Sequence, residues 1–440
     1  MFKHKLYKNK TAVILGAGKS GLACGSLLKK QGIEFCYWDE NKKLFPKQDI
    51  LSYDFFIKSP GISWQNKVLK QIKRAKKPVF SELEVAISYL PKGCKIFAIT
   101  GTNGKTTTTT MLGSILKEYS KEEGKHRQVY VLGNIGTPIA SKIGKIKENS
   151  LIVLEVSSYQ LEDSTYFNPH ASAILNITPD HLDHHGSYKK YIAAKAKIFK
   201  YQKAPQVLVI NGSDEICCSF LKKAKCRLFS FSSTPKKLIK SDVFFDGDEI
   251  IFASGSRVRP PKDLIGIHNI ENVMAASLVA FACGVHPSSV QKAMDKFKSI
   301  EHRIEYFATK KGVKYYNDSK ATNVDSVLIA LKALQTDKKL WLILGGLDKG
   351  APYTPLVAEI KKSCKHIVLI GSAAPKIAKE LKNICPMTDC KDLKTATKFI
   401  YKNAKKGDIC LLSPACASFD QFKSFEERGK FFKACVGKLK

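Results

Sequence analysis

The sequence predicts an α/β protein made of three segments, each containing a parallel sheet with helices packed on it. Short apolar runs typical of buried strands recur along the chain, and stretches with helical periodicity separate many of them. Glycine-rich turns follow two of these runs and lead into helices. The length of 440 residues agrees with this division, because domains usually hold roughly 100–200 residues and two to four are therefore expected.

The first segment, residues 1–92, begins with a strand at TAVIL (Thr11–Leu15). A glycine-rich turn and an apolar-periodic helix follow, and then a second strand at EFCYW (Glu34–Trp38). A third strand lies within DFFIKSPGI, which begins at Asp54. Strand, helix and strand at this spacing predict parallel βαβ units. The turn-forming Pro91-Lys92-Gly93 marks the predicted boundary.

The second segment, residues 93–298, begins with the buried strand KIFAIT and a second glycine-rich turn. The alternation and turn residues of Arg227–Phe252 predict antiparallel β-structure, and NIENVMAASLVAFACG predicts a closing helix. Further strands are expected at SLIVLEV (Ser150–Val156), SAILNI (Ser172–Ile177) and PQVLVIN (Pro205–Asn211).

The third segment, residues 299–440, again predicts strands separated by helices. Its polar, turn-forming motifs lie beside strand ends, where loops that bind ligands are common. The strands are VKYYND (Val313–Asp318), LWLILGG (Leu340–Gly346), HIVLIG (His366–Gly371) and DICLLS (Asp408–Ser413). The motifs are HRIE (His302–Glu305), NDSKATN (Asn317–Asn323), GGLDKG (Gly345–Gly350) and LSPACASFDQF (Leu412–Phe422).

The charge, hydropathy and cysteine content of the chain bear on nucleic-acid binding, membrane insertion and disulfide formation. The formal charge of +34 allows a nucleic-acid-binding ATPase, but the lysines spread along the chain without a basic stripe interleaved with aromatics. We therefore predict solvated lysines and no nucleic-acid partner. No run of 18 apolar residues occurs and the N-terminus lacks a cleavage site, which predicts no membrane insertion. The 13 scattered cysteines fit free thiols in a reducing cytoplasm.

ITGTNGKTT, at Ile99–Thr107, is the strongest motif. Backbone N–H groups in a turn between a strand and a helix point at phosphate oxygens, and the helix dipole favours their charge. Lys105 would pair with the β- and γ-phosphates, and the Thr106 hydroxyl would bind Mg²⁺. Ile99 stands where the usual GxxxxGK[ST] pattern has its first glycine, so the loop is a shortened P-loop. The alternative is an ordinary strand–turn–helix connection.

GAGKSG, from Gly16 to Gly21, matches a dinucleotide fingerprint, and Asp39 ends the next strand near the ribose-reading position. The match fits a site for NAD(P) or another phosphate-bearing nucleotide, and it also fits a turn with a purely structural role. An NAD-linked oxidoreductase would make no use of the phosphate-binding loop ITGTNGKTT. Two nucleotide motifs in one chain favour one site for ATP and one for a nucleotide-tagged substrate.

Two residues after central strands are candidate metal ligands. Glu155 ends a strand in EVSSYQLE, and His181 follows another in NITPDHLDHH. A strand-end carboxylate facing a P-loop suits Mg²⁺, which prefers oxygen ligands shared with phosphates. His181 could instead cap a turn, and the spacing of HxDHH matches no common zinc site.

Together these motifs resemble the Mur ligase family, whose members share the TGTNGKTT loop, and the resemblance covers essentially the whole chain. SPGI, EVSSYQLE, NITPDHLDHH, HRIE, NDSKATN and LSPACASFDQF are similar to the members that add D-glutamate to UDP-N-acetylmuramoyl-L-alanine in peptidoglycan synthesis. A member that adds another amino acid is the nearest alternative. The resemblance implies a cytoplasmic enzyme, a monomer by default, that uses ATP and Mg²⁺. It also implies a Rossmann-like N-terminal domain that binds UDP, a central P-loop ATPase domain and a Rossmann-like C-terminal domain.

The resemblance also assigns residues to sites. The residues expected to act in catalysis are Lys105, His181, Lys195 and Lys349. Those expected around ATP are Gly101, Thr102, Asn103, Gly104, Lys105, Thr106, Thr107, Asn269, Asn272, Arg303 and Asp318. The UDP-linked substrate is expected at Gly16, Gly18, Ser20, Gly21, Asp39, Gly61 and Asn134, and D-glutamate at Lys320, Thr322, Lys349, Ser418, Phe419 and Phe425. The metal is expected at Thr106, Glu155, His181 and Lys195.

The implied chemistry explains these residue types. A carboxylate acylates an amine only after activation, so ATP first converts it to an acyl phosphate, which the amine of D-glutamate then attacks. Two anions must meet, so cations are expected to converge there. Lys195 corresponds to a lysine that the family carries as a carbamate, which forms only from a neutral amine. Without the resemblance, Lys195 would be taken for a surface residue of an amphipathic helix.

Overall fold

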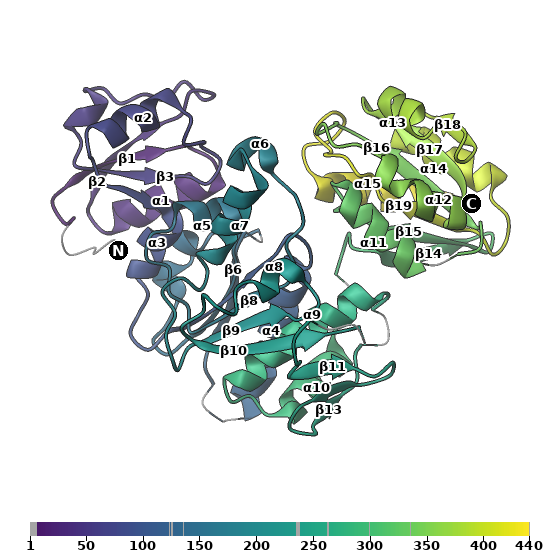
Figure 1. The fold of residues 1–440 in the computed structure, drawn as a ribbon. Coiled ribbons are helices and arrows are strands. Elements are labelled where there is room, and N and C mark those ends of the chain that lie inside the picture. The colour runs from purple at the N-terminus through teal and green to yellow at the C-terminus, as the bar shows by residue number, and fades with distance from the viewer. Residues whose placement is uncertain are drawn as a thin grey trace. The chain divides into compact units, whose positions relative to one another are not determined.

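The computed structural model describes residues 7–122, 124, 126–134, 136–234, 238–261, 264–298, 300–334 and 336–439, with only the backbone at Asp183. The predicted boundary at Ser299 therefore lies outside the described residues. The chain forms two compact units (Figure 1), one of Met1–Pro261 with Ile270–Phe297 and one of Lys262–Asn269 with Lys298–Lys440. Three sheets with helices confirm the predicted α/β class, two of them in the first unit.

The N-terminal sheet is wholly parallel and has the order β2-β1-β3-β4. The strands are β1 (Thr11–Leu15), β2 (Glu34–Trp38), β3 (Phe55–Lys58) and β4 (Val79–Ser81). The helices are α1 (Lys19–Lys30), α2 (Lys67–Arg74) and α3 (Glu82–Ser88). Apolar side chains bury both faces of β1 and β3, which is why TAVIL and FFI lack polar alternation.

The central sheet has the order β13-β12-β11-β10-β9-β8-β5-β7-β6. Its predicted antiparallel part is partly wrong, because β10 pairs in parallel with both β9 and β11, and only β11, β12 and β13 pair antiparallel. Alternation of side chains is the same in both kinds of strand, so it could not reveal direction. The strands are β5 (Lys95–Thr100), β6 (Val129–Gly133), β7 (Leu151–Glu155), β8 (Ala171–Ile174), β9 (Val207–Asn211), β10 (Arg227–Ser232), β11 (Val243–Phe245), β12 (Ile250–Phe252) and β13 (Arg257–Val258).

Most helices of the central region lie between its strands along the chain, and α9 (Ile267–Ala282) and α10 (Pro287–Lys296) follow the last strand. Helix α4 (Lys105–Glu122) runs from the carboxyl end of β5 and packs on α10. Helix α9 confirms the predicted closing helix. The others are α5 (Ser158–Asp163), α6 (Leu182–His185), α7 (Tyr188–Ala196) and α8 (Glu215–Cys218). A capping box between Ser157 and Gln160 fixes the start of α5 directly after β7.

The second unit contains the sheet β14-β15-β19-β16-β17-β18, in which only β14 is antiparallel to its neighbour. Its strands are β14 (Glu305–Lys310), β15 (Val313–Asn317), β16 (Leu340–Gly345), β17 (Cys364–Ile370), β18 (Met387–Asp389) and β19 (Ile409–Leu412). Its helices are α11 (Val324–Leu334), α12 (Val357–Ser363), α13 (Ala374–Glu380), α14 (Leu393–Asn403) and α15 (Phe425–Gly437). Apolar clusters cover both faces of the sheet.

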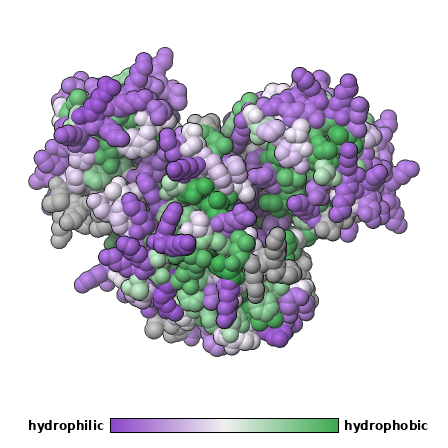
Figure 2. All heavy atoms as spheres, viewed as in Figure 1, coloured by the Kyte–Doolittle hydropathy of each residue, from purple (hydrophilic) through white to green (hydrophobic). Residues whose placement is uncertain are grey.

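Hydrophilic side chains cover much of the surface visible in Figure 2, as expected for dispersed, solvated lysines. Among the described helices, none combines the length and the apolar character needed to cross a bilayer. The cysteines of the described residues are free thiols, in agreement with the prediction from their scattered spacing.

Candidate functional site

The glycine-rich loop Gly101–Gly104 joins the buried strand β5 to helix α4. Gly104 has φ +83°, and a Cβ there would lie 2.2 Å from Asn272 Oδ1. The loop is anchored from the neighbouring strand, since Asn176 accepts the Thr102 N–H through its carbonyl and the Asn103 N–H through its side chain. This is the strand–turn–helix geometry that presents a helix N-terminus to phosphate.

Two lysines meet at one carbonyl oxygen of this loop. Lys105 Nζ donates to the Gly101 oxygen at 3.0 Å and to the Thr102 oxygen at 2.8 Å. Lys195 Nζ, on α7, donates to the same Gly101 oxygen at 2.8 Å. The structure therefore brings together two predicted catalytic residues that lie 90 positions apart in the sequence.

Lys195 is a buried lysine without a carboxylate hydrogen-bonded to its ammonium group among the described residues. Its exposed fraction is 1%, and its Nζ lies 4.8 Å from the centre of the Tyr191 ring. Burial lowers the pKa of Lys195 well below its usual value, and the charge of Lys105 lowers it further. Surface placement on an amphipathic helix, the alternative for this residue, is wrong.

Three predicted site residues form a hydrogen-bonded chain beside the loop. Thr106 Oγ1 donates to Glu155 Oε2 at 2.8 Å, and Asn134 Nδ2 donates to Glu155 Oε1 at 2.8 Å. Glu155 is 3% exposed because it ends the buried strand β7 next to β5. A hydroxyl and a carboxylate at this separation form an all-oxygen donor set suited to Mg²⁺.

His181 lies at the start of α6, with φ +53° in the left-handed region. Its Nδ1 is hydrogen-bonded to the Tyr159 hydroxyl at 3.0 Å, and its Nε2 lies 3.5 Å from Asp180 Oδ2. The side chain is 39% exposed, so it is accessible at the carboxyl edge of the sheet. His181 also occupies the N-cap position, so the turn-capping alternative applies to its backbone.

The first glycine-rich turn uses its glycines for packing. A Cβ on Gly21 would lie 1.9 Å from the Gly16 oxygen, so α1 can approach β1 only with glycine there. Asp39 Oδ2 accepts the Ala17 N–H at 2.7 Å, and the Lys42 ammonium donates to the Ala17 oxygen. Asp39 therefore braces the turn itself, while Gly18 and Ser20 lie at the start of α1.

A cavity of about 490 Å³ lies between the N-terminal sheet and the central region. Two residues predicted for the UDP-linked substrate, Gly61 and Asn134, line it. The Gly61 loop is held by a buried ion pair, with Lys58 Nζ 2.6 Å from Asp163 Oδ2, and Trp64 Nε1 donates to Asp163 Oδ1 at 2.9 Å. The remaining lining residues are Pro60, Ser63, Ser157, Tyr159 and His184.

In the second unit, Asp318 is a buried carboxyl group at the end of β15. It accepts hydrogen bonds from Ser413 Oγ at 2.7 Å and from the Ile304 N–H at 3.3 Å. Burial raises the pKa of Asp318 to about 7, although the charge of Arg303 opposes the rise. Arg303, which is predicted beside the same nucleotide, therefore lies near the Asp318 carboxyl group. Asn269, in the same unit, donates to the Ile265 oxygen at 2.9 Å.

Most of the predicted D-glutamate residues occupy loops at the carboxyl edge of the second unit's sheet, and Phe425 begins helix α15. Lys320 Nζ lies 5.3 Å from the centre of the Phe425 ring, and Thr322 follows two residues later. Ser418 is buried, whereas Phe419 is 69% exposed. Lys349 is exposed in the loop after β16. In the same loop, Leu347 forms an antiparallel bridge with Ala417.

Two family models match the chain. The Mur ligase middle domain matches residues 99–280, and the Mur ligase glutamate ligase domain matches residues 302–416. UDP-N-acetylmuramoylalanine–D-glutamate ligase from Elusimicrobium minutum is 52% identical, covering 98% of this chain and 99% of that protein. The enzyme of the same name from Koribacter versatilis is 40% identical, covering 98% of each. The chain belongs to the Mur ligase family.

Solved Mur ligase structures confirm the fold at low sequence identity. UDP-N-acetylmuramate-alanine ligase from Thermotoga maritima gives a TM-score of 0.64 at 16% identity, covering 98% of this chain and 100% of that one. A pseudomurein peptide ligase type C from Methanothermus fervidus gives 0.62 at 18% identity, with the same coverage. Both likenesses extend over nearly the whole of this Mur ligase and so support its overall fold.

Arg428, which no sequence motif singles out, organises the predicted D-glutamate loops of this Mur ligase. Arg428 is 1% exposed and donates to the carbonyl oxygens of Ser319 at 2.8 Å, Cys416 at 3.1 Å and Ala417 at 3.3 Å, and to Ser319 Oγ at 3.0 Å. It thereby ties the loop after β15 to the loop after β19. Nothing in EERGK distinguishes it from a surface helix residue, so only its position in the fold reveals this role.

Proposed function

We propose that this Mur ligase joins D-glutamate to UDP-N-acetylmuramoyl-L-alanine in peptidoglycan precursor synthesis, with conversion of ATP to ADP and phosphate through an acyl-phosphate intermediate. The observation that carries the proposal is the full-length identity of 52% to a protein of that name. The glycine-rich loop and Lys105 offer the phosphate-binding chemistry that the reaction needs, and Lys195 lies beside them on the same loop carbonyl.

Gly101–Thr107 is proposed to hold the ATP phosphates. The N-terminus of α4 favours negative charge, and Lys105, now folded onto its own loop, would swing to the β- and γ-phosphates. Asn272, which accepts a hydrogen bond from Thr108 Oγ1 at 3.1 Å, ties α9 to the start of α4, directly after this loop. Asn269, Arg303 and Asp318, which belong to the second unit, remain proposed ATP residues on the resemblance alone.

Thr106, Glu155 and His181 are proposed to hold Mg²⁺, together with Lys195 as its carbamate. The fit rests on the Thr106 hydroxyl and the Glu155 carboxylate, two oxygen donors 2.8 Å apart. When bound, Mg²⁺ would neutralise charge on the phosphates and the reacting carboxylate. The chain's own contribution is to keep Glu155 buried and oriented through Asn134.

The burial of Lys195 gives the carbamate a physical basis. CO₂ adds only to a neutral amine, and burial together with Lys105 favours the neutral form. The product would be an anion beside Lys105, so the repulsion that destabilises the ammonium group would become an attraction. Lys195 would then present oxygen atoms toward the loop in place of a positive charge.

The UDP-linked substrate is proposed to occupy the cavity at Gly61 and Asn134, with Gly16, Gly18, Ser20, Gly21 and Asp39 forming the adjoining turn. This places its reacting carboxylate toward Glu155 and the phosphate loop, since Asn134 contacts both the cavity and Glu155. D-glutamate is proposed at Lys320, Thr322, Lys349, Ser418, Phe419 and Phe425, where the cations would meet its two carboxylates.

Three functional domains at 1–92, 93–298 and 299–440 remain part of the proposal, supported by one sheet in each range. A monomer in the cytoplasm without a nucleic-acid partner also stays a prediction. The acyl phosphate would be exposed to hydrolysis, so exclusion of water during the reaction is expected to matter.

The deciding experiment measures phosphate release from ATP with UDP-N-acetylmuramoyl-L-alanine, with and without D-glutamate. Release that requires both substrates is expected. Release with L-alanine, meso-diaminopimelate or L-glutamate in place of D-glutamate would keep the family and change the amino acid. Absence of release with every amino acid would contradict the ligase proposal.

A further inference from the structure

A second cavity lies at the amino edge of the central sheet, away from the phosphate loop. Its volume is about 290 Å³, close to the lower end of the ~300–1,000 Å³ typical of ligand pockets. Strand β5 begins there at Lys95 and ends at the loop with Thr100, and the strand spans roughly 17 Å between these two residues. The cavity is therefore distinct from the proposed ligase site.

The floor of this cavity is apolar. It is formed by residues near the starts of the parallel strands β5, β7 and β9, by the second half of α4 and by the segment that follows α9. The buried floor residues are Phe97, Leu116, Leu151, Val207 and Val285, each at most 2% exposed. An apolar surface of this kind favours the flat or branched hydrocarbon body of a ligand.

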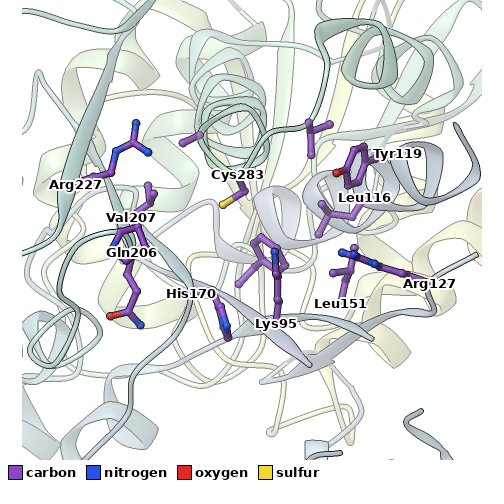
Figure 3. Close-up of a pocket in the computed structure, with 14 residues that line it drawn as sticks. Lys95, Leu116, Tyr119, Arg127, Leu151, His170, Gln206, Val207, Arg227 and Cys283 are labelled. Carbon is purple, nitrogen blue, oxygen red and sulfur yellow. The ribbon is translucent and has the colours of Figure 1, made fainter. Parts of the chain in front are cut away.

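The rim carries three cations and no carboxylate among its lining residues. Figure 3 shows Arg227 on one side, Arg127 on the other, and Lys95 and Cys283 between them. Within the described ranges, Lys95, Arg127 and Arg227 form no ion pair. Their positive charge is thus available to an anion.

Two of these cations are arginines in a chain in which arginine is rare. The sequence has only seven arginines, and the rest of its basic residues are lysines, yet two arginines line this one cavity. The planar guanidinium group binds carboxylate, phosphate and sulfonate oxygens through paired donors, which an ammonium group does not. A chance excess of surface lysine does not explain this selection.

His170 adds a hydrogen-bond donor to the rim. Its Nδ1 accepts the Ile96 N–H at 3.2 Å, so the neutral ring carries its proton on Nε2. Burial lowers the pKa of His170, with a further contribution from Lys95, which keeps the ring neutral near pH 7. The rim therefore offers donors and cations, and the floor offers apolar contact.

We propose that this cavity binds a small organic anion whose apolar body lies on the buried floor and whose oxyanion head meets the basic rim. Carboxylates, phosphates and sulfonates share the required head chemistry. The small volume limits the ligand to a compact molecule, which excludes a folded partner or a sugar nucleotide.

The test is a calorimetric titration of the full chain with 2-naphthoate. Wild type is expected to bind it, and Arg127→Glu/Arg227→Glu to bind at least about tenfold more weakly. The control Lys222→Glu/Lys223→Glu changes the net charge equally at exposed lysines outside the cavity and should keep wild-type affinity. No binding to folded wild type, or equal affinity in the arginine variant, would overturn the proposal.

Two further measurements separate an anion site from general apolar binding. Neutral naphthalene-2-carboxamide should bind wild type at least about tenfold more weakly than 2-naphthoate does. Bound 2-naphthoate should also slow alkylation of Cys283, which lines the cavity, as measured by peptide mass spectrometry. Equal affinity for the amide, or unprotected Cys283 at saturation, would contradict the assignment. Neither experiment uses ATP or a sugar nucleotide, so both are independent of the proposed ligase activity.

Discussion

The two edges of the central sheet differ in how they use positive charge. At the carboxyl edge, Lys105 and Lys195 converge on one loop carbonyl, and a hydroxyl–carboxylate chain through Glu155 lies beside them. At the amino edge, Arg127 and Arg227 rim an apolar cavity with no carboxylate in its lining. The same strands thus connect the site proposed for phosphates and Mg²⁺ with the cavity proposed for a small organic anion.

The contrast shows that burial has different chemical consequences at the two edges. At the carboxyl edge, burial lowers the pKa of Lys195 and favours a neutral nucleophilic amine. At the amino edge, burial raises the pKa of Cys283 to about 11, against the opposing charges of Lys95 and Arg227, and keeps the thiol protonated. Burial outweighs neighbouring cations in the second case and acts together with a cation in the first.

We expect the largest loss of phosphate release when Lys105, at the carboxyl edge, is replaced. Lys105→Ala removes the cation proposed to meet the γ-phosphate, and phosphate release should fall by roughly 10²–10³-fold. Lys117→Ala, at an exposed position of the same helix, should stay within about twofold of wild type. Similar losses of phosphate release in both variants would contradict a special role for Lys105 and its loop.

The next effect separates the chemistry of Lys195 from its packing. Lys195→Met keeps a buried unbranched side chain, so we expect unfolding free energy within about 1.5 kcal/mol of wild type. Phosphate release should fall by roughly 10²-fold, because methionine cannot form a carbamate. Wild-type release should also decrease in CO₂-depleted buffer and recover with bicarbonate. Full activity of the variant would show that Lys195 serves packing alone.

The next prediction concerns the free energy of unfolding and the need for glycine at position 104 of the phosphate loop. Gly104→Ala combines a positive φ with a Cβ 2.2 Å from Asn272 Oδ1, and should cost about 2–4 kcal/mol in urea denaturation. The matched control is Gly144→Ala, where a Cβ meets nothing within 4 Å. The control should change stability by about 0.5 kcal/mol or less. Equal losses would show that the loop tolerates a side chain.

The smallest effect concerns pH at the amino edge. With a pKa of about 11, Cys283 is protonated at neutral pH, and its thiolate fraction rises about tenfold per unit as pH increases toward 11. Its alkylation rate should therefore keep rising between pH 8 and 9.5, where an ordinary thiol with a pKa near 8.5 begins to level off. Peptide mass spectrometry of alkylated protein measures this rate. Levelling near pH 8.5 would show that Lys95 and Arg227 outweigh burial.

Sequence patterns predicted strands where apolar runs were long and bounded by turns. TAVIL and KIFAIT coincide with β1 and β5, because a strand buried on both faces has few polar residues. EFCYW coincides with β2, although this edge strand is only partly buried. The direction of β10 was wrong, and β6 and β14 were missed, because strands with mixed exposure lack a distinctive pattern.

The sequence alone determined the α/β class, the shortened phosphate loop and the candidate residues Lys105, Thr106 and Glu155, since local motifs fix a turn and its donors. Tertiary structure decided which distant groups meet. It placed Lys195 on the loop carbonyl, buried Arg428 against the loops after β15 and β19, and gathered Arg127 and Arg227 around one cavity. Burial and convergence depend on contacts between residues far apart in the chain, and no local pattern encodes them.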